Sequence, residues 1–275
     1  MTTQLEILQF LHYNPSSSRV KIAEALTKTL NERTLKRIIA DSVQKGDIVV
    51  EGKGKATRYS LSAQAQLTMP LDIDTYFSDD VDERIVQESF NFKLVCDILP
   101  NVTLFTTDEK ERLDVAHKAF LANMSTLSDV EYRKEMERLG VDVSWKSSQI
   151  EGNTYSLLET ERLLKEKETA QGKTKEEAVM LLNHKDALDF ILDYPDYLKE
   201  LTVRRIEDIH SILTKELGVG SGIRKRRVGI TGTNYRPLDN EFKIREALED
   251  TCTLINGKEN VFEKALLALV LLSYI

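Results

Sequence analysis

The chain has few of the residues that build disulfide frameworks or membrane spans. Of its 275 residues only two are cysteines, Cys96 and Cys252, and neither lies in a CxxC pattern, so the sequence indicates neither a disulfide scaffold nor a zinc site. The longest apolar run, residues 265–275, is too short to cross a bilayer. The N-terminal segment MTTQLEILQF lacks a basic region followed by a long apolar stretch, which argues against secretion. We therefore expect a cytoplasmic protein without membrane contact and without a metal site in residues 1–275.

The chain also lacks an excess of positive charge. Its 38 lysines and arginines face 45 acidic residues, which gives a net charge of −7 and argues against nucleic-acid binding by the whole chain. Residues 1–62 are the exception, because ten basic residues face six acids there and leave a net charge of +4. The remaining residues then carry −11. We expect any contact with nucleic acid to belong to this basic N-terminal part.

Residues 1–62 predict a small α+β domain. Apolar residues recur at helical spacing over residues 4–13, 19–26 and 31–45, with Asn31 as an N-cap and Gly46 as a helix stop. Two β-like segments, 47–50 and 57–61, flank a turn at residues 52–55. Three short helices followed by a hairpin with a basic tip are typical of a winged helix-turn-helix. Such a domain contacts DNA through its third helix and its wing, which here contain Arg33, Thr34, Lys36, Arg37, Lys53, Lys55 and Arg58. The alternative is a winged helix that binds protein or dimerises.

The rest of the chain predicts a mainly α architecture. Residues 63–80 contain Pro70 and several small or acidic residues, so we expect a linker there and a helical domain over residues 81–275. The apolar spacing predicts helices over residues 108–124, 129–140, 143–149, 156–168, 175–192, 203–217, 241–255 and 262–275. Asp108 is the expected N-cap of the first of these helices. A single β-like hairpin is expected over residues 226–235, with its tip at residues 231–234.

Two segments of this helical part stand out by their residue pattern. Residues 147–153, SSQIEGN, fit the pattern (S/T)xxxE(G/N), with Ser147, Glu151 and Gly152 in the required places. Residues 222–237, GIRKRRVGITGTNYRP, form the second segment. Their order and spacing resemble the Fic family of protein adenylyltransferases, and the resemblance covers residues 81–275.

The resemblance implies a role for each segment. The first would be an inhibitory helix in which Glu151, followed by Gly152 and Asn153, is the working residue. A carboxylate near the γ-phosphate of ATP pairs with a phosphate-binding arginine and repels the phosphate itself. The second would be a flap that aligns a target polypeptide by main-chain pairing, and it contains Val228, Gly229, Ile230, Thr231, Gly232, Thr233, Asn234 and Tyr235.

Each segment also has a simpler interpretation. Gly152 can be no more than the stop of a helix. The second segment can be an exposed hairpin with a basic stem, or its RKRR run can be a targeting tag.

The catalytic signature of the family, HxFx(D/E)GN(G/K)RxxR, does not occur in residues 1–275. None of the four histidines, His12, His117, His184 and His210, is followed by it, so we expect no catalytic residue in this part of the chain. In the family the signature follows an apolar helix, such as residues 262–275, and we expect it beyond Ile275. Its histidine would act as general base on a Ser, Thr or Tyr hydroxyl of a target, which attacks the α-phosphate of ATP beside a Mg²⁺ ion.

These expectations lead to two functional hypotheses. The first is a bacterial-type adenylyltransferase that uses ATP and Mg²⁺, modifies an unidentified target protein and is inhibited by Glu151. The alternative is a winged-helix transcriptional regulator that binds double-stranded DNA, with a degenerate, nucleotide-binding or non-catalytic Fic-like body. Beside these two, a degenerate Fic protein that binds nucleotide without transfer, or removes AMP, stays open. A homodimer is compatible with both.

Overall fold

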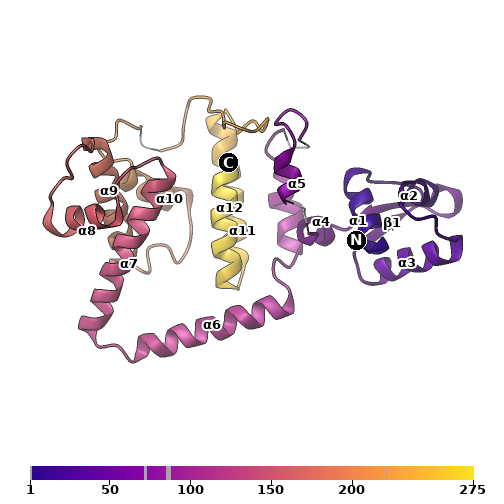
Figure 1. The fold of residues 1–275 in the computed structure, drawn as a ribbon, viewed down its shortest axis with the longest axis horizontal. Coiled ribbons are helices and arrows are strands. Elements are labelled where there is room, and N and C mark those ends of the chain that lie inside the picture. The colour runs from indigo at the N-terminus through magenta and orange to yellow at the C-terminus, as the bar shows by residue number, and fades with distance from the viewer. Residues whose placement is uncertain (1, 71–72, 85–87, 221) are drawn as a thin grey trace. The chain divides into compact units, whose positions relative to one another are not determined.

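The computed structural model describes residues 2–70, 73–84, 88–220 and 222–275. These residues are mainly helical, as the sequence predicted, and contain a single antiparallel sheet of two strands (Figure 1). The chain divides into two compact units. Unit 1 consists of Met1–Ile85 and Asp97–Thr106, and unit 2 of Val86–Cys96 and Thr107–Ile275. In the part of the chain that the structure describes, no helix combines the length and the apolar character that a membrane span requires.

Unit 1 begins with three helices and a hairpin. The helices are α1 (Thr3–Tyr13), α2 (Arg19–Ala25) and α3 (Glu32–Gln44), and the strands β1 (Ile48–Glu51) and β2 (Arg58–Leu61) follow. The strands pair from Ile48 with Leu61 to Glu51 with Arg58, and a 3-10 turn at Gly54–Ala56 lies between them. All of these elements lie within one residue of their predicted bounds.

The ends of α3 show why these elements were predictable. The side chain of Asn31 accepts a hydrogen bond from the main-chain N–H of Thr34 and so caps the start of the helix. At the other end Gly46 has φ +82°. The N–H of Gly46 donates to the carbonyl of Val43 at 3.1 Å, and that of Asp47 donates to the carbonyl of Ser42 at 2.9 Å. This pair of bonds is a Schellman motif, so Gly46 is the stop that the sequence predicted.

The predicted linker is part of unit 1. It contains the helices α4 (Ala63–Thr68) and α5 (Ile73–Ser78). Ala65 of α4 is buried in the same core as Ile7, Leu11, Ile22, Leu35, Ile39, Ile48 and Leu61. The side chain of Gln64 binds α4 to residues 97–106, the second segment of unit 1. Its amide nitrogen donates to the carbonyl of Thr103 at 2.7 Å, and its amide oxygen accepts from the N–H of Thr103 at 2.8 Å. The predicted boundary at residue 62 therefore lies inside a packed unit.

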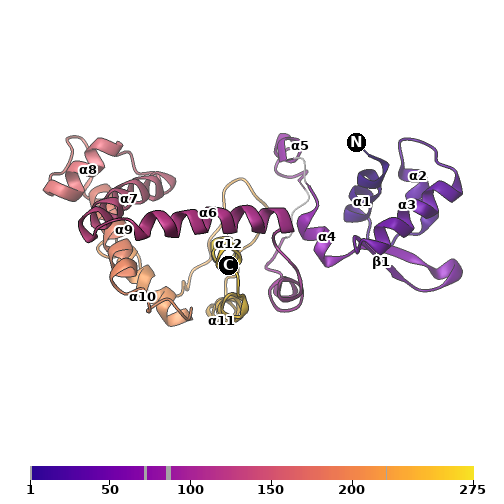
Figure 2. The ribbon, with the colours of Figure 1, turned by 90° about the horizontal axis from the view of Figure 1, so that it is seen from below.

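Unit 2 contains the longer helices. Short π and 3-10 turns at Leu94–Ile98 and Leu99–Asn101 precede α6 (Thr107–Ser125), α7 (Asp129–Ile150), α8 (Leu157–Glu166), α9 (Lys175–Asp193), α10 (Val203–Leu213), α11 (Glu241–Gly257) and α12 (Val261–Tyr274). Helices α7, α8, α9 and α10 pack together, and α11 lies beside α12 (Figures 1 and 2). Ser128, Ser156 and Thr174 begin α7, α8 and α9 with capping boxes.

Several helix bounds differ from the sequence-based prediction. Residues 129–140 and 143–149 belong to one continuous helix, α7. Gly140 interrupts the apolar pattern but not the helix, and a Cβ there would lie 3.0 Å from Cε of Lys185 on α9. Helix α6 begins at Thr107, so Asp108 lies in its first turn and is not its cap. Helix α10 ends at Leu213, before Glu216 adopts φ +60°.

The predicted hairpin over residues 226–235 is wrong as a pair of strands. The described residues 222–240 form no strand ladder. They contain a turn at Thr231 and Gly232, where Gly232 has φ +83°, and an isolated parallel β-bridge between Arg236 and Ser89. An isolated hairpin is marginal unless one face is buried. Val228 and Ile230 are 49% and 47% exposed, so no such face exists. We refer to residues 222–238 as the 222–238 loop.

Candidate functional site

The first candidate segment forms the C-terminal end of α7. Glu151 is the C-cap, and Gly152 follows with φ +88°. The N–H of Gly152 donates to the carbonyl of Gln149 at 3.0 Å, and the N–H of Asn153 donates to the carbonyl of Ser148 at 2.9 Å. A Cβ on Gly152 would meet nothing within 4 Å, so glycine is required there for its backbone conformation alone. Gly152 therefore ends α7, and the segment lies at a helix end as the sequence predicted.

Asn153 has a structural role in this motif. Its side chain is buried, donates to the carbonyl of Glu177 at 2.8 Å and accepts from the N–H of Tyr155 at 3.0 Å. The amide therefore joins the end of α7 to the first turn of α9. A side chain used in this way is not available to a ligand.

The same corner is fixed by the carboxylate of Glu177. One of its oxygens accepts from the N–H and the hydroxyl of Thr154 at 2.8 and 2.6 Å, and the other accepts from the N–H of Thr174 at 2.9 Å. These hydrogen bonds, with the Thr154 hydroxyl the largest contribution, lower the pKa of Glu177 to about 2. The ammonium of Lys173 donates to the carbonyl of Thr154 at 2.6 Å. The turn after α7 is thus tied firmly to α9.

Glu151 is the residue of the motif whose side chain remains free. It is exposed, it follows Ile150, which is 85% exposed, and its carboxylate has no hydrogen-bond or ion-pair partner among the described residues. Ser147 is half-buried, and its carbonyl accepts the N–H of Glu151 at 3.4 Å. The arginine partner expected from the resemblance is not supplied by the described part of the chain. The structure therefore presents a single unpaired carboxylate on a rigid corner.

The second candidate segment lies against the C-terminal end of α12. Nη2 of Arg224 donates to the carbonyls of Leu238 and Ile275 at 2.7 and 2.6 Å. The hydroxyl of Tyr235 donates to the carbonyl of Tyr274 at 2.6 Å, and the two rings stack with centroids 5.0 Å apart. Burial, followed by the charge of Tyr274, raises the pKa of Tyr235 to about 12. Tyr235 is therefore engaged at the base of the loop.

A third segment completes this cluster. The hydroxyl of Tyr274 accepts from the N–H of Asn91 at 3.1 Å and donates to the carbonyl of Ser89 at 3.2 Å. The rings of Phe90 and Tyr274 lie 4.8 Å apart, and the N–H of Arg236 donates to the carbonyl of Glu88 at 2.9 Å. Residues 88–91, 222–238 and the end of α12 are therefore one connected structure.

The outer part of the 222–238 loop is exposed. Val228, Gly229, Ile230, Thr231, Gly232 and Asn234 are all exposed, and Thr233 is half-buried. The basic run at its base is used within unit 2: Lys225 lies 3.7 Å from Glu241, and Arg227 lies 2.7 Å from Asp239. Arg226 has no ion-pair partner among the described residues. A run with most of its side chains engaged in this way fits a structural stem better than a targeting tag.

The predicted DNA-contacting residues lie on α3 and on the hairpin of unit 1. Thr34 is half-buried, and its N–H serves the cap of α3. Lys36 pairs with Glu32 at 3.0 Å, and Arg58 donates to the carbonyls of Lys55 and Thr57. The exposed basic side chains without an ion-pair partner among the described residues are Arg33, Arg37, Lys53 and Lys55.

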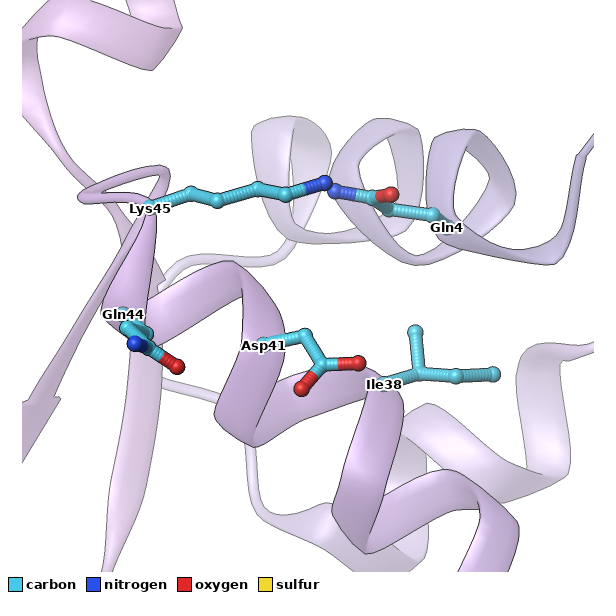
Figure 3. Close-up of a pocket in the computed structure, with 5 residues that line it drawn as sticks. All are labelled: Gln4, Ile38, Asp41, Gln44 and Lys45. Atoms are coloured by element: carbon cyan, nitrogen blue, oxygen red, sulfur yellow. The ribbon is translucent and has the colours of Figure 1, made fainter.

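A hollow between α1 and α3 lies toward the C-terminal end of α3. Figure 3 shows Lys45 and Gln4 extending toward each other above Asp41 and Ile38, and Gln44 completes the lining. None of the seven predicted DNA-contacting residues lines it. Its lining combines one acid with one base, so it offers no concentrated charge for a phosphate or a metal ion.

Sequence reasoning missed the part that Tyr274 and Asn91 play. They are 183 residues apart, and no local pattern indicates such a pairing. An aromatic residue with a hydroxyl at the end of an apolar helix was the available signal, since a buried tyrosine hydroxyl usually finds a partner.

No protein-family model, curated protein or solved structure matches this chain. Among the described residues, no three His, Cys, Asp or Glu side chains gather where they could hold a metal ion.

Proposed function

We propose that this chain is the regulatory and target-docking part of a Fic-type protein adenylyltransferase, which transfers AMP from ATP to a hydroxyl of another protein. The observation that carries the proposal is the attachment of the 222–238 loop to the end of α12 through Arg224 and Tyr235. By the resemblance, the catalytic signature directly follows this helix. A docking loop fixed at that point would hold a target beside the reacting groups.

The groups that bind ATP and Mg²⁺ are expected outside this sequence. The described residues hold no metal-ligand cluster. Bound nucleotide would supply the α-phosphate that the target hydroxyl attacks and pyrophosphate as the leaving group. The part played by this chain is to position the target and to regulate access of the nucleotide.

Glu151 suits an inhibitory role because its carboxylate is unpaired and its position is fixed. The main-chain hydrogen bonds of Gly152 and Asn153, which form a Schellman motif at the end of α7, and the side-chain contacts of Asn153 hold the main chain around Glu151. A like charge about 4 Å from a phosphate oxygen costs on the order of 4 kcal/mol at the effective dielectric of a protein surface. That cost is enough to disfavour a productive triphosphate.

The test measures incorporation of labelled AMP by a protein that contains this chain and the residues that follow it. Glu151→Gln removes the charge and keeps the shape, and Glu151→Gly also removes the side chain, which the C-cap backbone at φ −81° and ψ 7° tolerates. Both variants should raise incorporation at least about tenfold, the equivalent of 1.4 kcal/mol.

Asp193→Asn is the matched control, because Asp193 is also an exposed acid at the C-terminal end of a helix. It should leave incorporation unchanged. Equal incorporation by the wild type and both Glu151 variants would refute the inhibitory role of Glu151.

A second candidate function is the binding of duplex DNA by unit 1. The observation that favours it is the set of exposed, unpaired basic residues on α3 and the hairpin, Arg33, Arg37, Lys53 and Lys55. A helix and a wing of this kind contact the major groove and the phosphates. Fluorescence polarisation with duplex DNA at low and moderate salt tests it, and a complete lack of salt-sensitive binding would exclude it.

A further inference from the structure

The carbonyls at the C-terminal end of α12 have partners from far along the sequence. The carbonyl of Tyr274 accepts from the hydroxyl of Tyr235, and the carbonyl of Ile275 accepts from the guanidinium of Arg224. Both donors belong to the 222–238 loop. These two contacts join the base of the loop to residues 274 and 275.

The two donors stand at either end of the exposed part of the loop. Arg224 also donates to the carbonyl of Leu238 at 2.7 Å, so it connects the beginning of the 222–238 loop to its end. Residues 225–232 between the donors are exposed. The contacts fix where the loop begins and ends but leave its outer residues open.

The guanidinium and the phenol are also suited to a permanent contact. The Arg224 side chain is half-buried, and its Nε is enclosed without a hydrogen-bond partner in the described structure. An arginine remains charged at every physiological pH. The pKa of Tyr235, raised to about 12, keeps its hydroxyl a donor over the same range. The contacts should thus not respond to ordinary changes of pH.

From this geometry we infer that Arg224 and Tyr235 are positioning residues that form a latch, defined as the contacts of these two side chains with the carbonyls of Leu238, Tyr274 and Ile275. The latch makes the 222–238 loop and the end of α12 move as one body. The inference rests on the proposed function in one respect: it assigns the latch the task of setting the distance between a docked target and the catalytic groups. The latch itself requires no assumption about the reaction.

The first arm of the test measures hydrogen exchange of main-chain amides in the full protein. Tyr235→Phe keeps the stacked ring and removes only the hydroxyl, and Arg224→Gln removes the two bonds of the guanidinium. Each should quicken exchange in residues 225–238 and 272–275 about five- to tenfold, the effect of one net hydrogen bond, and leave α9 unchanged.

The matched controls are an exposed tyrosine and an exposed arginine elsewhere in unit 2. Tyr194→Phe removes a tyrosine hydroxyl from an exposed residue, and Arg226→Gln removes an exposed arginine two positions away. Neither should alter exchange in the loop. Unchanged exchange in Tyr235→Phe would overturn the latch, and that variant decides the matter alone if Arg224→Gln unfolds unit 2.

The second arm measures AMP transfer to a protein target by the protein extended beyond Ile275. Tyr235→Phe should raise KM for the target about five- to tenfold while kcat and KM for ATP stay within about twofold, the signature of lost uniform binding. Arg224→Lys should recover part of the loss caused by Arg224→Gln, because an ammonium can still donate to a carbonyl. A fall in kcat with an unchanged target KM would overturn the positioning role.

The two arms separate the two proposals. Absence of transfer by the wild type and by the Glu151 variants refutes the transferase, while the exchange data still decide the latch. Active transfer with unaltered exchange in Tyr235→Phe refutes the latch and leaves the transferase in place.

Discussion

Glu177 accepts hydrogen bonds on both carboxylate oxygens, from Thr154 on one and from Thr174 on the other. At the scale of single residues, unit 2 depends on such polar contacts at helix ends. Asn153 and Tyr235 act in the same way, each satisfying main-chain groups that secondary structure leaves unpaired. Asn153 and Tyr235 were predicted as parts of functional motifs, and in the structure they support the residues around them.

The lowered pKa of Glu177 predicts a loss of stability in acid. Because the folded state holds this carboxylate at a pKa of about 2 instead of the ordinary 4.5, its contribution is complete above pH 4.5 and disappears as the pH falls toward 2. Thermal unfolding of the wild type and of Glu177→Gln over this pH range measures whether the stability contributed by Glu177 falls with falling pH. The variant should be less stable than the wild type at neutral pH, and the difference should narrow as the pH falls.

Glu176→Gln is the control for this titration. Glu176 is adjacent in the chain and exposed, and its carboxylate has no partner among the described residues. Its replacement should leave the acid dependence of unfolding as in the wild type. A difference between Glu177→Gln and the wild type that stays constant from neutral to acid pH would contradict the linkage.

At the scale of elements, the helix boundaries set by local signals were predictable and those set by tertiary contacts were not. Asn31 and Gly46 act on their own neighbours, so the sequence located both ends of α3. The continuity of α7 through Gly140, which lies against Lys185 of α9, had no such local signal. The 222–238 loop was predicted as a hairpin from its β-like residues. Strand pairing also needs a buried face, and its apolar residues have none.

In the candidate sites, too, features set by local sequence were predictable and those set by tertiary contacts were not. Placing SSQIEGN at a helix end required only local pattern, and the structure has it there. The bonds from Arg224 to Ile275 and from Tyr235 to Tyr274 span 51 and 39 residues. Contacts over such separations leave no periodic trace in the sequence, so the attachment of the loop to α12 could be found only in the structure.

The end of α7 provides a prediction at this scale. Gly152→Ala should destabilise unit 2 by about 1–2 kcal/mol, because an L-residue at φ +88° is strained even where its Cβ has room. Gly257→Ala at the last residue of α11 is the matched change. Gly257 also has open space, but its φ is not positive, so alanine should stabilise by up to about 1 kcal/mol there. Urea unfolding of both variants measures the contrast, and shifts of the same sign would disprove the account.

At the scale of the whole molecule, the net charge is positive in the N-terminal residues 1–62 and negative in the rest of the chain. Residues 1–62 carry +4 in a chain of net −7. If unit 1 binds duplex DNA, each phosphate contact should contribute about 0.9 to the slope of log affinity against log salt. Replacement of Arg33, Arg37, Lys53 and Lys55 by glutamine should flatten that slope by as many as about 3 to 4 units.

Lys45→Gln is the control for the salt dependence. Lys45 follows the opposite end of α3 and lines the hollow of Figure 3. Lys45→Gln should alter the slope of log affinity against log salt by much less than replacement of Arg33, Arg37, Lys53 or Lys55. An equal effect at Lys45 would indicate nonspecific attraction by charge and not a defined surface on α3 and the hairpin.

The unpaired side chain of Glu151 has a consequence for how such a protein can evolve. Because no contact among the described residues depends on that carboxylate, substitutions at position 151 should change the local charge and leave the folding equilibrium nearly untouched. If Glu151 inhibits as proposed, the strength of that inhibition could therefore change from one descendant to the next at little cost in stability, one codon at a time.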